Sequence, residues 1–156
     1  MPNWCENILE IDGDVDDISK IVESKLEFQK LRPCPYIDDK GEPLHNAWHT
    51  WCLLHWGVKW EINQNTLIMD MSDAVPTQLK LEFPTAWGPC CEILRYLTEI
   101  MPSLSIIHRY FEGGMHIAGE YHYKDGKITK IEINDKSVFI SEHFDEDYKE
   151  FLDDEE

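Results

Sequence analysis

Residues 77–101 read TQLKLEFPTAWGPCCEILRYLTEIM, a strand pattern followed at once by a helix pattern. Apolar and polar residues alternate over Thr77–Phe83, which is the period of a half-buried strand. From Pro89 the apolar residues recur at helical spacing until Pro102 ends the pattern. Pro89 suits the first turn of a helix, because its missing N–H would have no partner there. The stretch therefore predicts a β-α unit in the middle of the chain.

A second unit of the same kind is predicted near the N-terminus. Residues 3–11 form a strand pattern, and Gly13-Asp14 ends it and caps a helix that runs from Val15 to about Leu26. Further strands are expected at 58–62, 66–71, 104–111, 115–123 and 127–133, with an extra helix over 44–55. A short strand at 137–140 and an acidic C-terminal helix or tail over 141–156 complete the expectation.

Two β-α units among mostly antiparallel strands predict an α+β fold of the ferredoxin-like, split βαβ type. We expect the two main helices on one face of the sheet, with the helix near 44–55 and the acidic C-terminal helix as additions. Because the sequence shows neither an internal repeat nor a low-complexity linker, residues 1–156 are expected to form a single domain.

The chain is strongly acidic, with 31 Asp and Glu against 14 Lys and Arg and a net charge of −17. Such a charge repels phosphate backbones and anionic membranes, so direct nucleic-acid or membrane binding is not expected. A host protein with a basic surface, or a small nucleotide-like ligand, is an acceptable partner. The five cysteines, an odd number without a leader sequence, favour reduced thiols in a cytoplasmic protein.

A group of aromatic and polar residues at predicted strand ends and turns is the main candidate site. Indole faces can stack on a flat ligand, an amide can read a hydrogen-bonding edge, and an ammonium can meet a phosphate. The alternative is that the tryptophans are core residues, with Lys59 and Glu112 paired to each other. The candidate ligand-binding residues are Trp4, Asn7, Trp56, Lys59, Trp60, Trp87 and Glu112.

A metal site is conceivable in the predicted helix over 44–55. His45, His49 and Cys52 follow one another at the four- and three-residue spacing that places three potential zinc ligands on one helix face. Zinc would need a fourth ligand or a bound water. The alternative is an amphipathic helix with solvated imidazoles, and no cofactor at all.

Four short strings, taken together, resemble the YubB-type (Api-like) ferredoxin-like family of plasmid, phage and mobile-element proteins. The resemblance covers about residues 2–120 and implies a ferredoxin-like fold and a viral or mobile-element origin, but no activity. Cys90 after Pro89 and the acidic C-terminal extension depart from the family pattern. The strings are Pro2–Asn7 (PNWCEN), Trp56–Trp60 (WGVKW), Phe83–Pro89 (FPTAWGP) and Tyr110–Gly114 (YFEGG).

No phosphate-binding loop, nucleophile elbow or kinase signature occurs in the sequence. The leading hypothesis is a non-enzymatic accessory binding protein acting inside the host cell on a protein or a small nucleotide-like ligand. One alternative is a small metal-assisted or nucleotide-processing enzyme. Another is a structural component that self-assembles through exposed strand edges.

Overall fold

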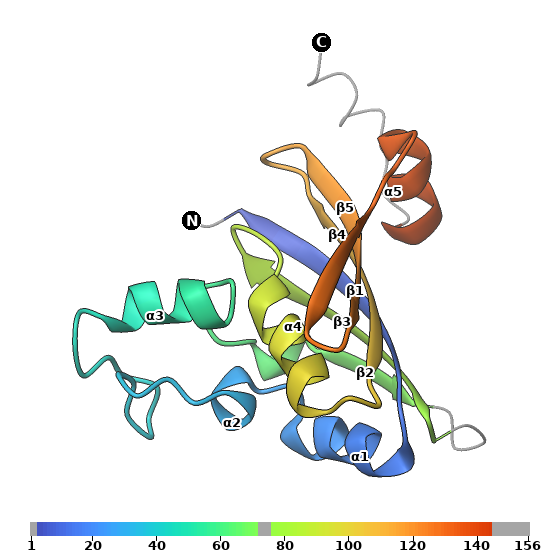
Figure 1. Cartoon of the computed structure of the whole chain (residues 1–156). Coiled ribbons are helices and arrows are strands. Elements are labelled where there is room, and N and C mark those ends of the chain that lie inside the picture. The colour runs from blue at the N-terminus through green and yellow to red at the C-terminus, as the bar shows by residue number, and fades with distance from the viewer. Residues whose placement is uncertain (1–2, 72–75, 145–156) are drawn as a thin grey trace.

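The computed structural model describes residues 3–71 and 76–144 and contains one six-stranded antiparallel sheet in the order β2-β3-β1-β4-β5-β6 (Figure 1). Its strands are β1 (Trp4–Asp12), β2 (Ile68–Met71), β3 (Gln78–Ala86), β4 (Ser105–Glu112), β5 (Ile117–Lys124) and β6 (Lys127–Ile131). Its helices are α1 (Val15–Ser24), α2 (Phe28–Leu31), α3 (Trp48–His55), the 3-10 turn η1 (Gln64–Thr66), α4 (Cys91–Ile100) and α5 (Lys136–Phe144).

The inner part of the sheet has the predicted ferredoxin-like topology. Strand β1 lies between β3 and β4, α1 leads from β1 toward β2, and α4 connects β3 to β4. Strands β5 and β6 extend the sheet beyond β4 through successive antiparallel pairs. The expected α+β fold with two β-α units is therefore confirmed.

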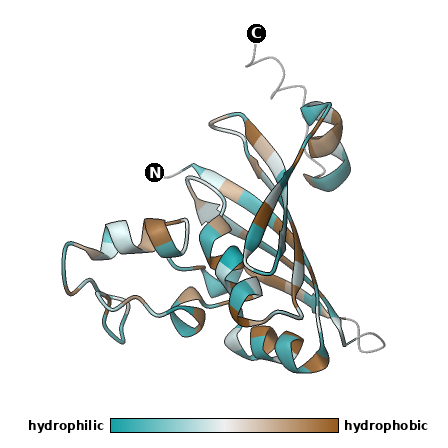
Figure 2. Cartoon of the chain, in the orientation of Figure 1, coloured by the Kyte–Doolittle hydropathy of each residue, from teal (hydrophilic) through white to brown (hydrophobic). Residues whose placement is uncertain are grey.

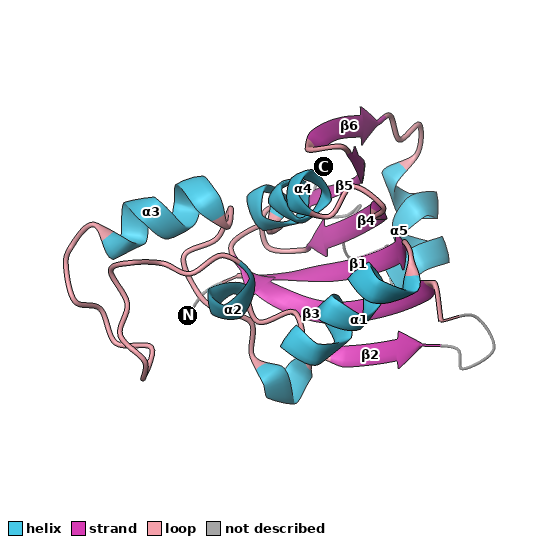
Figure 3. Cartoon of the chain, turned by 60° about the horizontal axis from the view of Figure 1, so that its bottom comes forward, coloured by secondary structure: helices cyan, strands magenta, loops and turns pink. Residues whose placement is uncertain are grey.

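Helices α1 and α4 lie on the same side of the sheet (Figure 3). Leu9 of β1 and Leu81 of β3 are fully buried in one core with Ile18 of α1 and with Ile93 and Leu97 of α4. Hydrophobic and hydrophilic residues alternate along the strands and these helices, as expected for elements with one buried side (Figure 2). The carboxylate of Asp14 caps α1 by accepting the N–H of Asp17 at 2.8 Å, as the sequence predicts.

Helix α5 covers part of the opposite face. Phe139 and Ile140 pack with Phe111 of β4 and Ala118 of β5, which pair across the two strands. Phe111 lies between the buried residues Tyr110 and Glu112, so strand alternation turns it to the other side of the sheet.

Two local predictions are wrong. Residues 58–62 form an irregular segment rather than a strand. Residues 137–140 belong to α5, because the Asp135 carboxylate accepts the N–H groups of Ser137 and Val138 and so begins the helix at Lys136. The described part of the predicted 141–156 helix ends at Phe144, and residues 145–156 lie outside the described residues. No helix among the described residues has the length and apolar composition needed to cross a membrane.

Candidate functional site

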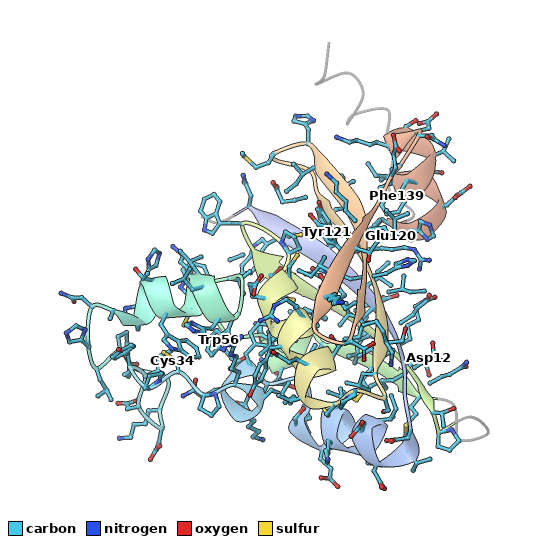
Figure 4. All side chains as sticks on the ribbon, in the orientation of Figure 1. Asp12, Cys34, Trp56, Glu120, Tyr121 and Phe139 are labelled. Atoms are coloured by element: carbon cyan, nitrogen blue, oxygen red, sulfur yellow. The ribbon has the colours of Figure 1, made fainter. Side chains whose placement is uncertain are left out.

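The long connection between α1 and β2, residues 25–67, folds beside the α1/α4 layer and carries α2 and α3 (Figure 1). Trp56 anchors it: the indole is 1% exposed, donates its N–H to the carbonyl of Arg32 at 2.9 Å and packs on Phe28. Cys34 lies in the same region (Figure 4). The connection is thus attached to the main core by a buried tryptophan.

Glu61 fixes the start of α2. Its carboxylate accepts the backbone N–H groups of Phe28 at 2.7 Å, Gln29 at 2.8 Å and Ile62 at 2.9 Å. Desolvation raises the pKa of Glu61, although the three hydrogen bonds act in the opposite direction. The carboxylate therefore holds together segments that are 32 or more residues apart in sequence.

A groove of about 770 Å³ lies between α2, the loop 37–43 and residues 56–61. Trp48 and Trp60 contribute indole surface to it, and Trp60 is 42% exposed. The ammonium of Lys59 lies 4.9 Å from the centroid of the Trp60 ring. The volume falls within the range of roughly 300–1,000 Å³ that small-molecule sites occupy.

The charges around the groove are unevenly neutralised. Lys30 pairs with Glu27 at 3.1 Å, and the Asp38 carboxylate accepts the backbone N–H groups of Lys40 and Glu42. In contrast, the ammonium groups of Lys40 and Lys59 form no ion pair with any residue that the structure describes. The groove therefore offers two ammonium groups without carboxylate partners in a protein of net charge −17.

The predicted aromatic and polar group is only partly brought together. Trp56, Lys59 and Trp60 line the groove. Trp87 lies in a second, smaller hollow, of which Lys59 is also a lining residue. Trp4 pairs with Ala86 at the end of β1 and is half exposed.

Asn7 lies in the interior, in a buried hydrogen-bond network. Its amide nitrogen donates to the carbonyl of Phe83 at 3.1 Å and to the hydroxyl of Thr85 at 2.9 Å. The amide oxygen must therefore accept, so His108 carries its proton on Nε2 and donates at 2.8 Å. The other ring nitrogen, Nδ1, accepts the hydroxyl of Tyr123 at 2.8 Å. Burial lowers the pKa of His108 to about 3, so the ring is neutral at pH 7 and its role is structural.

Glu112 is also buried, at 1% exposure. Its carboxylate accepts the N–H groups of Gly114 at 2.7 Å and Met115 at 2.8 Å and so shapes the turn between β4 and β5. No ion pair joins it to Lys59 among the described residues, in contrast to the pairing considered from the sequence.

The three potential zinc ligands do not lie on one helix face, because α3 begins at Trp48 and His45 precedes it. The ring of His45 accepts the N–H of Ala47 at 3.0 Å, and His49 is exposed with its ring edge-on to Trp48. Cys52 is fully buried, and desolvation, with a smaller effect of Cys34, raises its pKa to about 12. Across residues 3–71 and 76–144, no three His, Cys, Asp or Glu side chains are grouped so that they could hold a metal ion.

Sequence reasoning missed Glu61, Trp48 and the loop 37–43, which together form much of the groove. The sequence holds little that points to these groove residues, because a glutamate after a tryptophan forms no pattern from which its role can be predicted. Its partners, Phe28 and Gln29, belong to a four-residue helix too short to show a periodicity.

The fold and the groove define a ferredoxin-like α+β protein with a ligand-sized cavity in an added connection. Residues 55–151 match the family described as "Ferredoxin-like domain in Api92-like protein", and the chain belongs to this family. The matched range starts after β1, although β1 is a central strand of the sheet.

Among solved structures, the chain is similar to the crystal structure of a protein api92 from Yersinia pseudotuberculosis, with a TM-score of 0.50 and 18% identity. The alignment covers 69% of this chain and 40% of that protein, so the chain spans less than half of it. None of the curated proteins compared with the chain matches it.

Proposed function

We propose that the protein is a non-enzymatic binding protein whose groove takes a small, flat, anionic ligand of nucleotide-like chemistry. The observation that carries the proposal is the exposed indole of Trp60 beside the ammonium of Lys59, in a cavity of about 770 Å³. Any nucleobase can stack on an indole, and an ammonium can form an ion pair with a phosphate. The family resemblance adds a YubB-type, plasmid or phage origin and action in the host cytoplasm to the same proposal.

The local charge supports a small ligand rather than a polynucleotide. Lys40 and Lys59 line the same cavity, which suits a ligand with one or two phosphates. The lining also carries the carboxylates of Glu27, Asp38, Asp39 and Glu61. A long phosphate backbone would extend past the groove over a surface that is negatively charged like the phosphates themselves, and would be repelled there.

Replacing Trp60 with alanine is expected to weaken binding of AMP or ADP by about tenfold or more, because stacking on one aromatic ring contributes about 1–3 kcal/mol per base. Isothermal titration of the full chain with each nucleotide measures the effect. Trp4→Ala is the matched control, since Trp4 is similarly exposed but lies outside the groove lining. Unchanged affinity in the Trp60 variant, or no nucleotide binding by the original chain, would contradict the proposal.

A host protein with a basic surface is a second candidate, supported by the concentration of charge at the C-terminus. Residues 142–156 contain nine acidic residues and one lysine. Removing them is expected to reduce the association rate with a basic partner most strongly at low salt, because exposed charges are screened beyond roughly 10 Å at 0.1 M ionic strength. Surface plasmon resonance across a salt series measures this rate. A rate that is the same with and without the segment would argue against the candidate.

A further inference from the structure

A second hollow, of about 300 Å³, is lined in part by residues 57–59 and shares Lys59 with the groove. Leu53 of α3 and Trp87 at the end of β3 form its exposed apolar walls, and the buried side chain of Val58 contributes to its lining. His49 and Lys59 add nitrogen-bearing side chains to the lining. The hollow therefore combines an apolar cavity with potential donors to an anion, and it is about large enough for one aliphatic side chain.

Trp87 is held in a backbone conformation that its residue type rarely adopts. Its φ is +72°, in the left-handed region where a bulky side chain is disfavoured. Neighbouring hydrogen bonds hold the turn: the N–H of Trp87 donates to the carbonyl of Asn3 at 2.7 Å, and the Thr85 hydroxyl donates to the carbonyl of Gly88 at 2.6 Å. The backbone thus follows this path because of its own hydrogen bonds.

The indole of this strained residue lies outside the buried core. Trp87 is 48% exposed and is absent from the buried residues of the core. A glycine would adopt the same φ without strain and leave the backbone hydrogen bonds in place. Strained residues whose side chains the core does not use are typical of functional sites, and an exposed tryptophan is a frequent anchor of protein interfaces.

The nitrogen-bearing side chains around the hollow favour a partner that carries a carboxylate. Lys59 has no carboxylate partner among the described residues, and His49 is exposed. An aliphatic group between Leu53 and Trp87 would place an adjacent carboxylate within the reach of these two side chains. A basic segment at the same place would meet Lys59 with a like charge.

We infer that this hollow docks a protein partner through its C-terminal residue, an aliphatic side chain with the terminal carboxylate beside it. Trp87 is the anchor, Leu53 forms the facing wall, and Lys59 with His49 binds the carboxylate. This surface shares Lys59 with the groove but is otherwise lined by different residues, and the inference does not rest on the proposed nucleotide ligand.

The test uses the full chain with ¹⁵N-labelled tryptophan and two probes, N-acetyl-leucine and N-acetyl-leucinamide, which differ only in the carboxylate. The indole cross-peak of Trp87, assigned by its loss in Trp87→Phe, is expected to shift saturably with N-acetyl-leucine and at least tenfold more weakly with the amide. Leu53→Ala should weaken the response at least fivefold. Leu54→Ala is its matched control, because Leu54 is exposed outside the lining of the hollow.

A groove variant at a residue outside the hollow, Lys40→Ala, should leave the response unchanged, so failure of this inference and failure of the nucleotide proposal are separable. Trp87→Gly should leave the melting temperature equal or higher, because glycine adopts the positive φ without strain. The inference is overturned by equal shifts with acid and amide, by no shift of Trp87, or by shifts that depend on protein concentration alone, which would indicate a contact between copies. A marked drop in the melting temperature of Trp87→Gly would likewise overturn it, since the indole would then serve the fold.

Discussion

Acidification from pH 6.5 to pH 3 is expected to remove about 4 kcal/mol of folding free energy through His108 alone. Burial lowers the pKa of this ring from its usual 6.5 to about 3, and each pKa unit corresponds to about 1.4 kcal/mol. His108 is fully buried between β1 and β5, where the carboxamide of Asn7 and the hydroxyl of Tyr123 take up both ring nitrogens.

The sign follows from which state binds the proton. Between pH 3 and 6.5 the unfolded chain protonates His108 and the folded chain does not, so the unfolded state binds more protons and gains stability as the pH falls. Well above pH 6.5 the ring is neutral in both states and the contribution is complete. A protonated ring would also present a donor at Nδ1, where the neutral ring accepts from Tyr123.

Urea unfolding at intervals between about pH 3 and pH 7 measures the effect, with His108→Gln as the matched control. Glutamine does not titrate, and it carries an N–H group for Asn7 and an oxygen for Tyr123. All other titrating groups are common to both chains, including Glu61, whose raised pKa acts in the opposite direction. The pH dependence of the histidine chain should therefore be the steeper one. Parallel curves would show that His108 is protonated in the folded state near its ordinary pKa.

The main elements of the fold could be predicted because their signals are local. The alternation over β3 and the helical spacing after Pro89 depend on neighbouring residues only, and Asp14 caps α1 within three residues of itself. The strand prediction for residues 137–140 is wrong because the deciding signal lies outside this short stretch. Four residues of which three are apolar are ambiguous between strand and helix, and the Asp135 carboxylate, which favours a helix by accepting two backbone N–H groups, precedes them.

The site could be predicted only in part, because the sequence does not show whether a given side chain is exposed in the groove or buried in the core. Trp60 and Trp56 are four residues apart and both line the groove, yet one is exposed and the other is the buried anchor. The sequence predicts that Asn7 binds a ligand. In the structure it lies on the helix-covered side of β1, and its amide is hydrogen-bonded to Thr85 and His108. Such assignments depend on contacts about 80 to 100 residues apart in the chain, such as those of Asn7 to Thr85 and His108.

Gly57→Ala is expected to lower the free energy of unfolding by about 3 kcal/mol and to weaken ligand binding in the groove. Gly57 has a φ of +88°, and a Cβ atom there would lie 3.0 Å from the backbone nitrogen of Cys91 and 3.1 Å from that of Glu92. The left-handed conformation costs an alanine about 1–2 kcal/mol, and the contact with backbone that cannot rotate away adds about 1–3 kcal/mol. Chemical unfolding measures the stability, and nucleotide titration measures the binding.

Gly41→Ala separates these two contributions. Gly41 has a similar φ of +80°, but a Cβ atom there meets nothing within 4 Å, so only the conformational cost of about 1 kcal/mol remains. The excess at Gly57 then reports how tightly the connection is held against α4, where the carbonyl of Trp56 accepts the N–H of Ile93 at 3.2 Å. Because Trp56 lies before Gly57 and Lys59 and Trp60 follow it, a shift at this contact moves both walls of the groove relative to each other. Equal losses in the two variants would mean that the connection yields at this point, and the groove would then be shaped by its own loops rather than by the core beneath it.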